Sequence, residues 1–185
     1  MIIDIHAHLG NINFAPFWAA DADRLEQYAG QAGVDTLCVS SARAIMYDTS
    51  EGNRELDAAL RQTSRLLGYV VVNPMFPETV GDLGLMDKNP KFIGAKMHPD
   101  YHGYDLASPS VRGCLDAVAE RVPLILFHTS CMPGTGFADA GAILDFAARH
   151  PRTRIVMAHM AGIFQNGNYP YFPNFRGLEK VAERR

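Results

Sequence analysis

The sequence predicts an α/β fold in which a mostly parallel sheet is covered by helices. Short runs rich in β-branched residues recur roughly every 30 residues, which is the size of one strand–helix–strand unit. Between these runs lie segments whose apolar residues repeat at the three- and four-residue spacing of a helix. The runs themselves are apolar on both faces, which is typical of strands in a sheet that is buried on both sides.

Six runs are expected to be strands, and four segments between them are expected to be helices. The predicted strands are Ile2–His8, Val34–Ser40, Gly68–Asn73, Phe92–His98, Pro123–His128 and Arg154–His159. The predicted helices are Asp21–Gln31, Asn53–Leu66, Ser110–Glu120 and Ala138–Arg149, and a glycine-interrupted helix is predicted at Pro77–Met86. The loops that leave the strands are longer than those that return to them. Parallel α/β folds bind ligands at that edge, so a site is expected there.

Composition excludes several classes of protein. The 185 residues carry 17 Lys and Arg against 20 Asp and Glu, a net charge of −3, with 48% hydrophobic residues. This balance is typical of one globular domain, here residues 1–185, and argues against a disordered chain or a basic nucleic-acid-binding protein. The apolar runs are too short to span a membrane. Three cysteines without zinc-type spacing, and polar residues where an export signal would need an apolar core, favour the cytoplasm.

Histidines gather at the carboxyl ends of the predicted strands. Five of the seven histidines take such places: His6, His8, His98, His128 and His159. His6 and His8 are two residues apart in one strand, so their side chains are expected on the same face. Several neutral imidazoles around one point are what zinc, iron or manganese prefers as ligands. The residues therefore predict a metal site at this edge.

Four segments that contain these histidines resemble the amidohydrolase superfamily. They are Ile3–His8, Ile93–Pro99, Leu126–Thr129 and Val156–Gly162. More narrowly, they resemble the amidohydrolase-related branch, which includes aminocarboxymuconate-semialdehyde decarboxylase and many metal-dependent hydrolases. The resemblance implies a (β/α) TIM barrel, which has eight β/α units. Only about six units are predicted here, so the barrel is expected to be truncated. We expect a second copy of the chain to cover the exposed sheet edges in a homo-oligomer, or the chain to be part of a longer product.

The resemblance also implies roles for individual residues. His6, His8 and His128 are expected to bind a divalent metal ion, with zinc favoured, and His159 is expected to act as the catalytic acid/base. Lys96 is expected to bind an anionic group of the substrate. The alternatives are that Lys96 is carboxylated and bridges two metal ions, or that it is a buried structural lysine.

Three further residues are candidates for substrate binding. His98 shares a strand face with Lys96, Arg43 follows the second predicted strand and could pair with a carboxylate, and Trp18 lies in the loop after the first strand. Arg43 could equally be an ordinary surface residue, and the aromatic loop residues could simply cover the barrel.

The expected function is that of a metal-dependent hydrolase that uses metal-activated water on a small carboxylated or cyclic substrate. One alternative is a metal-dependent decarboxylase that uses the same histidines. Another is an inactive, incomplete barrel that serves as a binding or assembly module. No nucleic-acid or membrane partner is expected.

Overall fold

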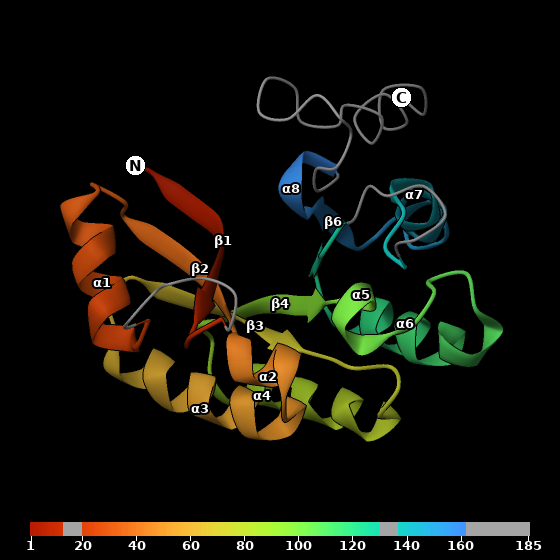
Figure 1. Ribbon diagram of the computed structural model, residues 1–185, viewed down its shortest axis with the longest axis horizontal. Coiled ribbons are helices and arrows are strands. Elements are labelled where there is room, and N and C mark those ends of the chain that lie inside the picture. Colours follow the sequence, from red (N-terminus) through yellow and green to blue (C-terminus); the bar gives the residue numbers. More distant parts are fainter. Residues whose placement is uncertain (13–19, 130–136, 162–185) are drawn as a thin grey trace. The chain divides into compact units, whose positions relative to one another are not determined.

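A computed structural model of the chain describes residues 1–12, 20–129 and 137–161 (Figure 1). Within this part of the chain, six strands alternate with helices. The chain divides into two compact units. Of the described residues, those within 1–73 and 78–95 form the first unit, and 74–77 together with those from Lys96 to Ala161 belong to the second.

The strands form one sheet whose order follows the sequence, β1-β2-β3-β4-β5-β6. Their bounds are β1 (Ile3–Leu9), β2 (Thr36–Ser41), β3 (Leu66–Val71), β4 (Phe92–Met97), β5 (Leu124–Phe127) and β6 (Arg154–Met157). The pairs β1–β2, β2–β3 and β5–β6 are parallel. Parallel strands that neighbour one another in sequence order, with helices between them, have the connectivity of a (β/α) barrel. The predicted fold class is therefore confirmed, with six of the eight units described.

Helices follow each of the six strands. They are α1 (Ala22–Gln31), α2 (Ala42–Met46), α3 (Thr49–Gln62), α4 (Gly84–Lys88), α5 (Pro99–His102), α6 (Pro109–Arg121), α7 (Ala140–Arg149) and α8 (Ala158–Ala161), and a 3₁₀ helix spans Pro77–Leu83. The short helices α2, α5 and α8 were not predicted, because one or two turns are too few for a periodic pattern. No helix in the described part of the chain is long and apolar enough to cross a bilayer.

Several predicted boundaries were wrong, among them those of one helix and two strands. The helix predicted at Asn53–Leu66 begins and ends four residues earlier, because the side chain of Asp48 accepts a hydrogen bond of 2.9 Å from Glu51 N and caps it there. Leu66 instead begins β3, two residues before the predicted strand. The sixth strand ends at Met157, so that His159 belongs to the short helix α8 and not to the strand end.

The core of the first unit lies between α3 and the strands β2 and β3. Leu56 and Leu60 on α3 are fully buried, as are Val70 and Val71 on β3. Asn53 is fully buried as well, and its amide both donates to the carbonyl of Val71 (2.8 Å) and accepts from its N–H (2.9 Å). This polar side chain therefore fastens α3 to the carboxyl end of β3.

The second unit packs its core between β5 and the helix α7. Phe127 at the end of β5 meets Phe146 of α7 edge to face, with ring centroids 5.4 Å apart. One turn later, at the carboxyl end of α7, His150 Nε2 lies 2.8 Å from an oxygen of Asp116 on α6. These contacts hold the last turns of α7 against β5 and α6.

Candidate functional site

Two histidines of the predicted metal site lie side by side on β1. The ring centroids of His6 and His8 are 5.1 Å apart in an edge-to-face arrangement. Two imidazoles that bind one zinc ion through nitrogens at about 2.0–2.1 Å, at tetrahedral angles, have centroids about 5 Å apart. The pair therefore fits two corners of a tetrahedral metal site.

Polar contacts within the first unit hold this strand. The backbone N–H of His6 donates to the Asp4 carboxylate at 3.0 Å. His8 Nδ1 lies 3.0 Å from Ser40 Oγ, which belongs to the neighbouring strand β2. A histidine that binds a metal ion through one ring nitrogen commonly hydrogen-bonds through the other. The contact of His8 Nδ1 with Ser40 is of that kind.

In the second unit, His128 follows β5 and is enclosed by groups from β4 and α5. Its ring stacks on that of His98, with centroids 3.9 Å apart and planes 14° apart. Its Nε2 lies 3.1 Å from a carboxylate oxygen of Asp100. The backbone N–H of His128 also donates to the carbonyl of Met97 at 2.9 Å. His128 is buried, so these contacts fix the orientation of its ring.

His159 completes a chain of contacts with His128. His159 Nε2 lies 3.3 Å from His128 Nδ1. If His128 Nε2 carries the proton donated to Asp100, its Nδ1 is the acceptor, and His159 Nε2 is then the donor. Both ring nitrogens of His128 are thus engaged by protein groups. His128 could therefore bind a metal ion only by exchanging one of these contacts.

The backbone of His159 adopts an unusual conformation. Its φ of 58° lies in the left-handed region, which residues other than glycine rarely adopt. Conformations of this kind cost about 1–3 kcal/mol and cluster at functional sites, where the surrounding structure maintains them. The conformation aims the His159 side chain at His128 from a helix that begins one residue earlier.

Burial changes the ionisation of two groups in the second unit. Lys96 is fully buried, and desolvation lowers the pKa of its amine to about 7. Desolvation and then the nearby charge of Lys96 lower the pKa of His159 to about 4. His159 still exposes part of its surface, and the solvent there limits this depression. The direction leaves the His159 imidazole neutral near pH 7.

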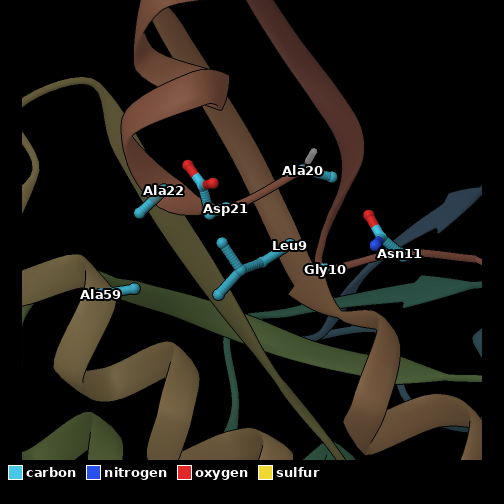
Figure 2. A pocket seen from close by; sticks show the side chains of 7 residues that line it. All are labelled: Leu9, Gly10, Asn11, Ala20, Asp21, Ala22 and Ala59. Atoms are coloured by element: carbon cyan, nitrogen blue, oxygen red, sulfur yellow. The ribbon is translucent and has the colours of Figure 1, made fainter. Parts of the chain in front are cut away.

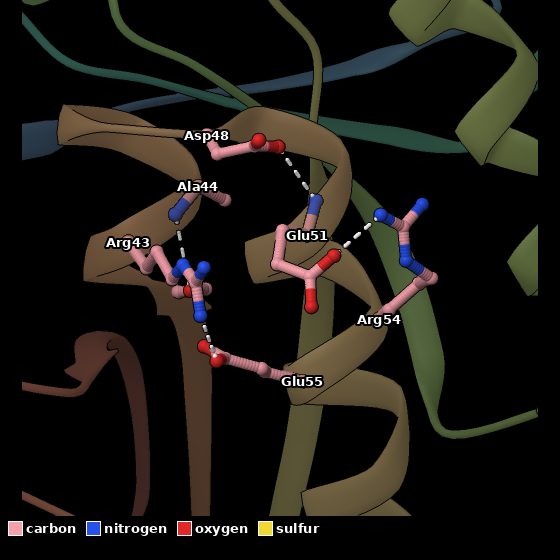
Figure 3. A network of polar contacts seen from close by, with 7 residues as sticks. Arg43, Ala44, Asp48, Glu51, Arg54 and Glu55 are labelled. Carbon is pink, nitrogen blue, oxygen red and sulfur yellow. Dashed lines mark hydrogen bonds and ion pairs between the residues drawn. The ribbon is translucent and has the colours of Figure 1, made fainter.

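The other predicted substrate-binding residues have different surroundings. Arg43 lies on α2, and its guanidinium forms an ion pair with Glu55 on α3 (Figure 3). Both side chains are about half exposed, so this pair joins two helices at the surface. His98 caps the first turn of α5, because its Nδ1 accepts from the N–H of Tyr101 at 3.3 Å. Trp18 lies outside the described residues.

An open hollow of about 380 Å³ lies beside the end of β1 (Figure 2). Its lining is mostly aliphatic and consists of Leu9, Gly10, Asn11, Ala20, Asp21, Ala22 and Ala59. Asp21 is the charged residue among these described lining residues, and its carboxylate accepts from Arg24 N at 2.9 Å as the cap of α1. The described lining residues include no histidine.

The histidines do not form a complete metal site within the described residues. Among residues 1–12, 20–129 and 137–161, no three His, Cys, Asp or Glu side chains are grouped so that they could hold a metal ion. His6 and His8 lie in the first unit and His128 in the second. The donor chemistry of His6 and His8 fits a metal, while the third ligand stays a prediction.

Comparison with known families identifies the chain. A model of the amidohydrolase family matches residues 3–184. The chain belongs to this family. The resemblance expected from the four histidine segments is therefore confirmed. A comparison with curated protein sequences found no match.

Solved structures of hydrolases and decarboxylases share the fold. A probable 2-pyrone-4,6-dicarboxylic acid hydrolase from Acinetobacter baumannii, with citric acid bound, has a TM-score of 0.59 and 17% identity; the alignment covers 86% of this chain and 58% of that one. The IDCase of Metarhizium anisopliae in apo form has a TM-score of 0.66 and 14% identity, and the alignment covers 100% of this chain and 73% of that one. The 5-carboxyvanillate decarboxylase of Sphingomonas paucimobilis has a TM-score of 0.56 and 15% identity, and the alignment covers 75% of this chain and 51% of that one. At these identities the likeness shows the fold alone.

Sequence reasoning missed three residues that contact the candidate site of this amidohydrolase family member. Asp100 contacts His128, Ser40 contacts His8, and Tyr69 donates to the carbonyl of Ile5 at 3.0 Å. Asp100 could have been found, because it follows His98 and Pro99 directly in the sequence. Ser40 and Tyr69 gave no such signal, since a buried Ser or Tyr at a strand end is ordinary.

Proposed function

We propose that this family member is a metal-dependent hydrolase that acts on a small carboxylated substrate through metal-activated water. The observation that supports this most directly is the cluster of His128, His159 and Asp100, with the buried Lys96, at the carboxyl ends of β4 to β6. In (β/α) barrels the carboxyl ends of the strands are where catalytic residues lie. Because the chain spans 58% of the first hydrolase compared, the activity is proposed for the whole protein.

His6, His8 and His128 are the proposed ligands of one divalent metal ion, with zinc favoured because imidazole donors suit it. A bound metal ion of this kind lowers the pKa of a water molecule to about 7 and so supplies a nucleophile at neutral pH. Carboxylation of Lys96 is the alternative that would permit a second metal ion. The low pKa of the Lys96 amine supports a neutral, nucleophilic nitrogen, which that reaction with carbon dioxide requires.

His159 is the proposed acid/base. Its Nε2 lies 3.3 Å from Nδ1 of His128, so His159 stands beside a proposed metal ligand, where its imidazole can accept a proton from the attacking water. The lowered pKa of His159 keeps this imidazole neutral near pH 7. The proton that it gains can then pass to the leaving group. Asp100 supports His128 by accepting from its Nε2, which leaves Nδ1 of His128 to exchange its contact with His159 for the metal ion.

A carboxylate is the proposed recognition element of the substrate. Lys96 and His98 are the groups proposed to bind it, together with Trp18 against a planar ring. The relatives support this class, since the names of two of them contain a dicarboxylic acid and a carboxyvanillate. Arg43 is a weaker candidate, because it already pairs with Glu55.

Decarboxylation is the second candidate, because the same cluster can hold a carboxylated ring and two of the compared structures are an IDCase and a decarboxylase. Product analysis separates the two functions. The protein is incubated with 2-pyrone-4,6-dicarboxylic acid and, separately, with 5-carboxyvanillate. A ring-opened acid without gas supports hydrolysis, whereas stoichiometric carbon dioxide supports decarboxylation and overturns the hydrolase proposal.

Metal analysis tests the proposed site independently of any substrate. Elemental analysis of the wild-type protein is compared with that of a His6→Ala/His8→Ala double variant. The control is His150→Ala, which removes an imidazole that pairs with Asp116 at the far end of α7. We expect about one equivalent of metal in the wild type and the control, and a loss in the double variant. Equal metal in all three proteins would contradict the site.

Self-association and cellular location are further proposals. We propose that a second copy of the chain pairs with the edge at β1, which ends the sheet order and carries the exposed side chains of Ile3 and Ile5. A cytoplasmic location is supported by Cys38 and Cys114, which are free thiols in the described part of the chain.

A further inference from the structure

Strand β1, which carries His6 and His8, has an irregular register between Asp4 and Ala7. Asp4 aligns with Leu37 of β2, but Ala7 aligns with Val39, so β1 advances three residues while β2 advances two. One extra residue is therefore inserted in the segment of Ile5 and His6, which is a β-bulge. Bulges re-aim side chains, and this one includes His6 and lies just before His8.

A contact from β3, which lies beyond β2 in the sheet, fixes the bulged segment. The hydroxyl of Tyr69 on β3 donates to the carbonyl of Ile5 at 3.0 Å, and Tyr69 is only 1% exposed. The carbonyl of a bulged residue leaves the regular ladder, so another donor is needed to replace the ladder hydrogen bond. Tyr69 supplies that donor across the width of β2, so the bulge is held in one conformation.

Ser40 contacts the imidazole ring of His8. It aligns with His8 in the register of β1 and β2, is fully buried, and lies with its Oγ 3.0 Å from His8 Nδ1. The hydrogen bond made by one ring nitrogen decides which nitrogen carries the proton. When Oγ accepts from Nδ1–H, the lone pair lies on Nε2, which is the form that binds a metal ion.

We infer that Ser40 and Tyr69 are positioning residues of the metal site, Ser40 by selecting the Nδ1–H tautomer of His8 and Tyr69 by holding the bulge that orients His6. The inference rests on the proposed function for its consequence, because the benefit is tighter metal binding. The tautomer and the bulge can be observed without metal, so the two proposals can fail separately.

Nitrogen-15 NMR of the metal-free protein, at a pH where His8 is neutral, reads the tautomer directly. We expect the Nδ1–H form of His8 in the wild type, a mixture of tautomers in Ser40→Ala, and recovery in Ser40→Thr, which retains the hydroxyl. The control is Ser41→Ala: Ser41 is equally buried, but its hydroxyl accepts from Ala44 N at 3.1 Å and caps α2. An Nε2–H tautomer in the wild-type protein would overturn the inference even if Ser40→Ala did not fold.

Zinc affinity, measured by competition with a chromophoric chelator, tests the consequence. Loss of a hydrogen bond to a metal-binding histidine typically weakens binding about 10- to 100-fold. We expect that loss in Ser40→Ala and in Tyr69→Phe, which removes only the hydroxyl, and wild-type affinity in Ser41→Ala. If Ser40→Ala and Tyr69→Phe bind zinc as tightly as the wild type, the two residues have no positioning role. Failure of the wild type to bind zinc while His8 keeps its Nδ1–H tautomer would contradict the proposed function and the consequence for binding, and leave the tautomer assignment standing.

Discussion

Lys96 has an ionisable amine that is buried away from water. Its side chain is fully buried, and desolvation lowers the pKa of the amine from 10.5 to about 7. A buried lysine costs free energy of folding unless its charge is compensated, and the cost falls on the protonated form. Retaining such a residue beside His159 is typical of functional sites, where perturbed pKa values concentrate.

The pKa of Lys96 predicts a pH-dependent stability. Between pH 7 and 10.5 the unfolded chain binds a proton at this amine that the folded chain does not, so the free energy of unfolding rises with pH across that window. Lys96→Met should remove this slope and stabilise the protein below pH 7, by an amount on the order of several kcal/mol. Urea unfolding at pH 6.5, 8 and 9.5 measures the difference. The exposed Lys88→Met serves as control, and an unchanged slope in Lys96→Met would show that Lys96 is charged when folded.

At the scale of elements, the contact between α2 and α3 depends on one glycine. A Cβ at Gly52 would lie 2.2 Å from the backbone nitrogen of Ala44 and 2.6 Å from its Cα. These atoms are backbone, so they cannot swing aside as the end of a side chain would. α2 begins at the cap Ser41, directly after β2, and Arg43 on α2 pairs with Glu55 on α3 (Figure 3). Close packing at Gly52 therefore sets where the chain goes after β2.

Gly52→Ala should destabilise the first unit by about 1–3 kcal/mol or more, because the helices must separate to accept the methyl group. The matched control is Gly81→Ala, where a Cβ meets nothing within 4 Å. That change should alter the free energy of unfolding by no more than about 0.5 kcal/mol. Chemical denaturation followed by circular dichroism compares the two. Equal stability of both variants would contradict the close approach of α2 and α3.

At the scale of the molecule, β1 combines two features. It carries His6 and His8, and it exposes the side chains of Ile3 at 47% and Ile5 at 47%. A strand at the end of a sheet with exposed apolar side chains readily pairs with another chain. This feature supports association of copies through β1.

Ile3→Lys should reduce self-association, because it places a charge in the proposed contact between copies. Sedimentation equilibrium over a range of protein concentrations measures the dissociation constant, which we expect to increase at least about tenfold for a loss of roughly 1.4 kcal/mol. Tyr28→Lys, an equally exposed apolar position on α1, is the control and should leave the constant unchanged. A monomeric wild-type protein would refute association through this edge.

Much of the fold could be predicted from the sequence, because strands and longer helices leave periodic patterns that do not depend on distant contacts. The runs Phe92–His98 and Ser110–Glu120 agree with β4 and α6 to within one residue at each end. The α3 boundary could not be predicted in this way, because it depends on the cap at Asp48 and on burial of Asn53 against β3. The place of His159 in α8, and not at a strand end, could not be predicted either. The helix is only four residues long, and the left-handed backbone of His159 leaves no periodic pattern in the sequence.

By itself, the sequence determined the α/β class, the order of the elements and the family, because hydrophobic periodicity and the His-containing segments are local properties of the chain. The tertiary structure decided which side chains meet: Ser40 with His8, Asp100 and His159 with His128, and Arg43 with Glu55. Such pairings depend on register, bulges and burial. These arise only when separate strands and helices pack, so no stretch of sequence contains them.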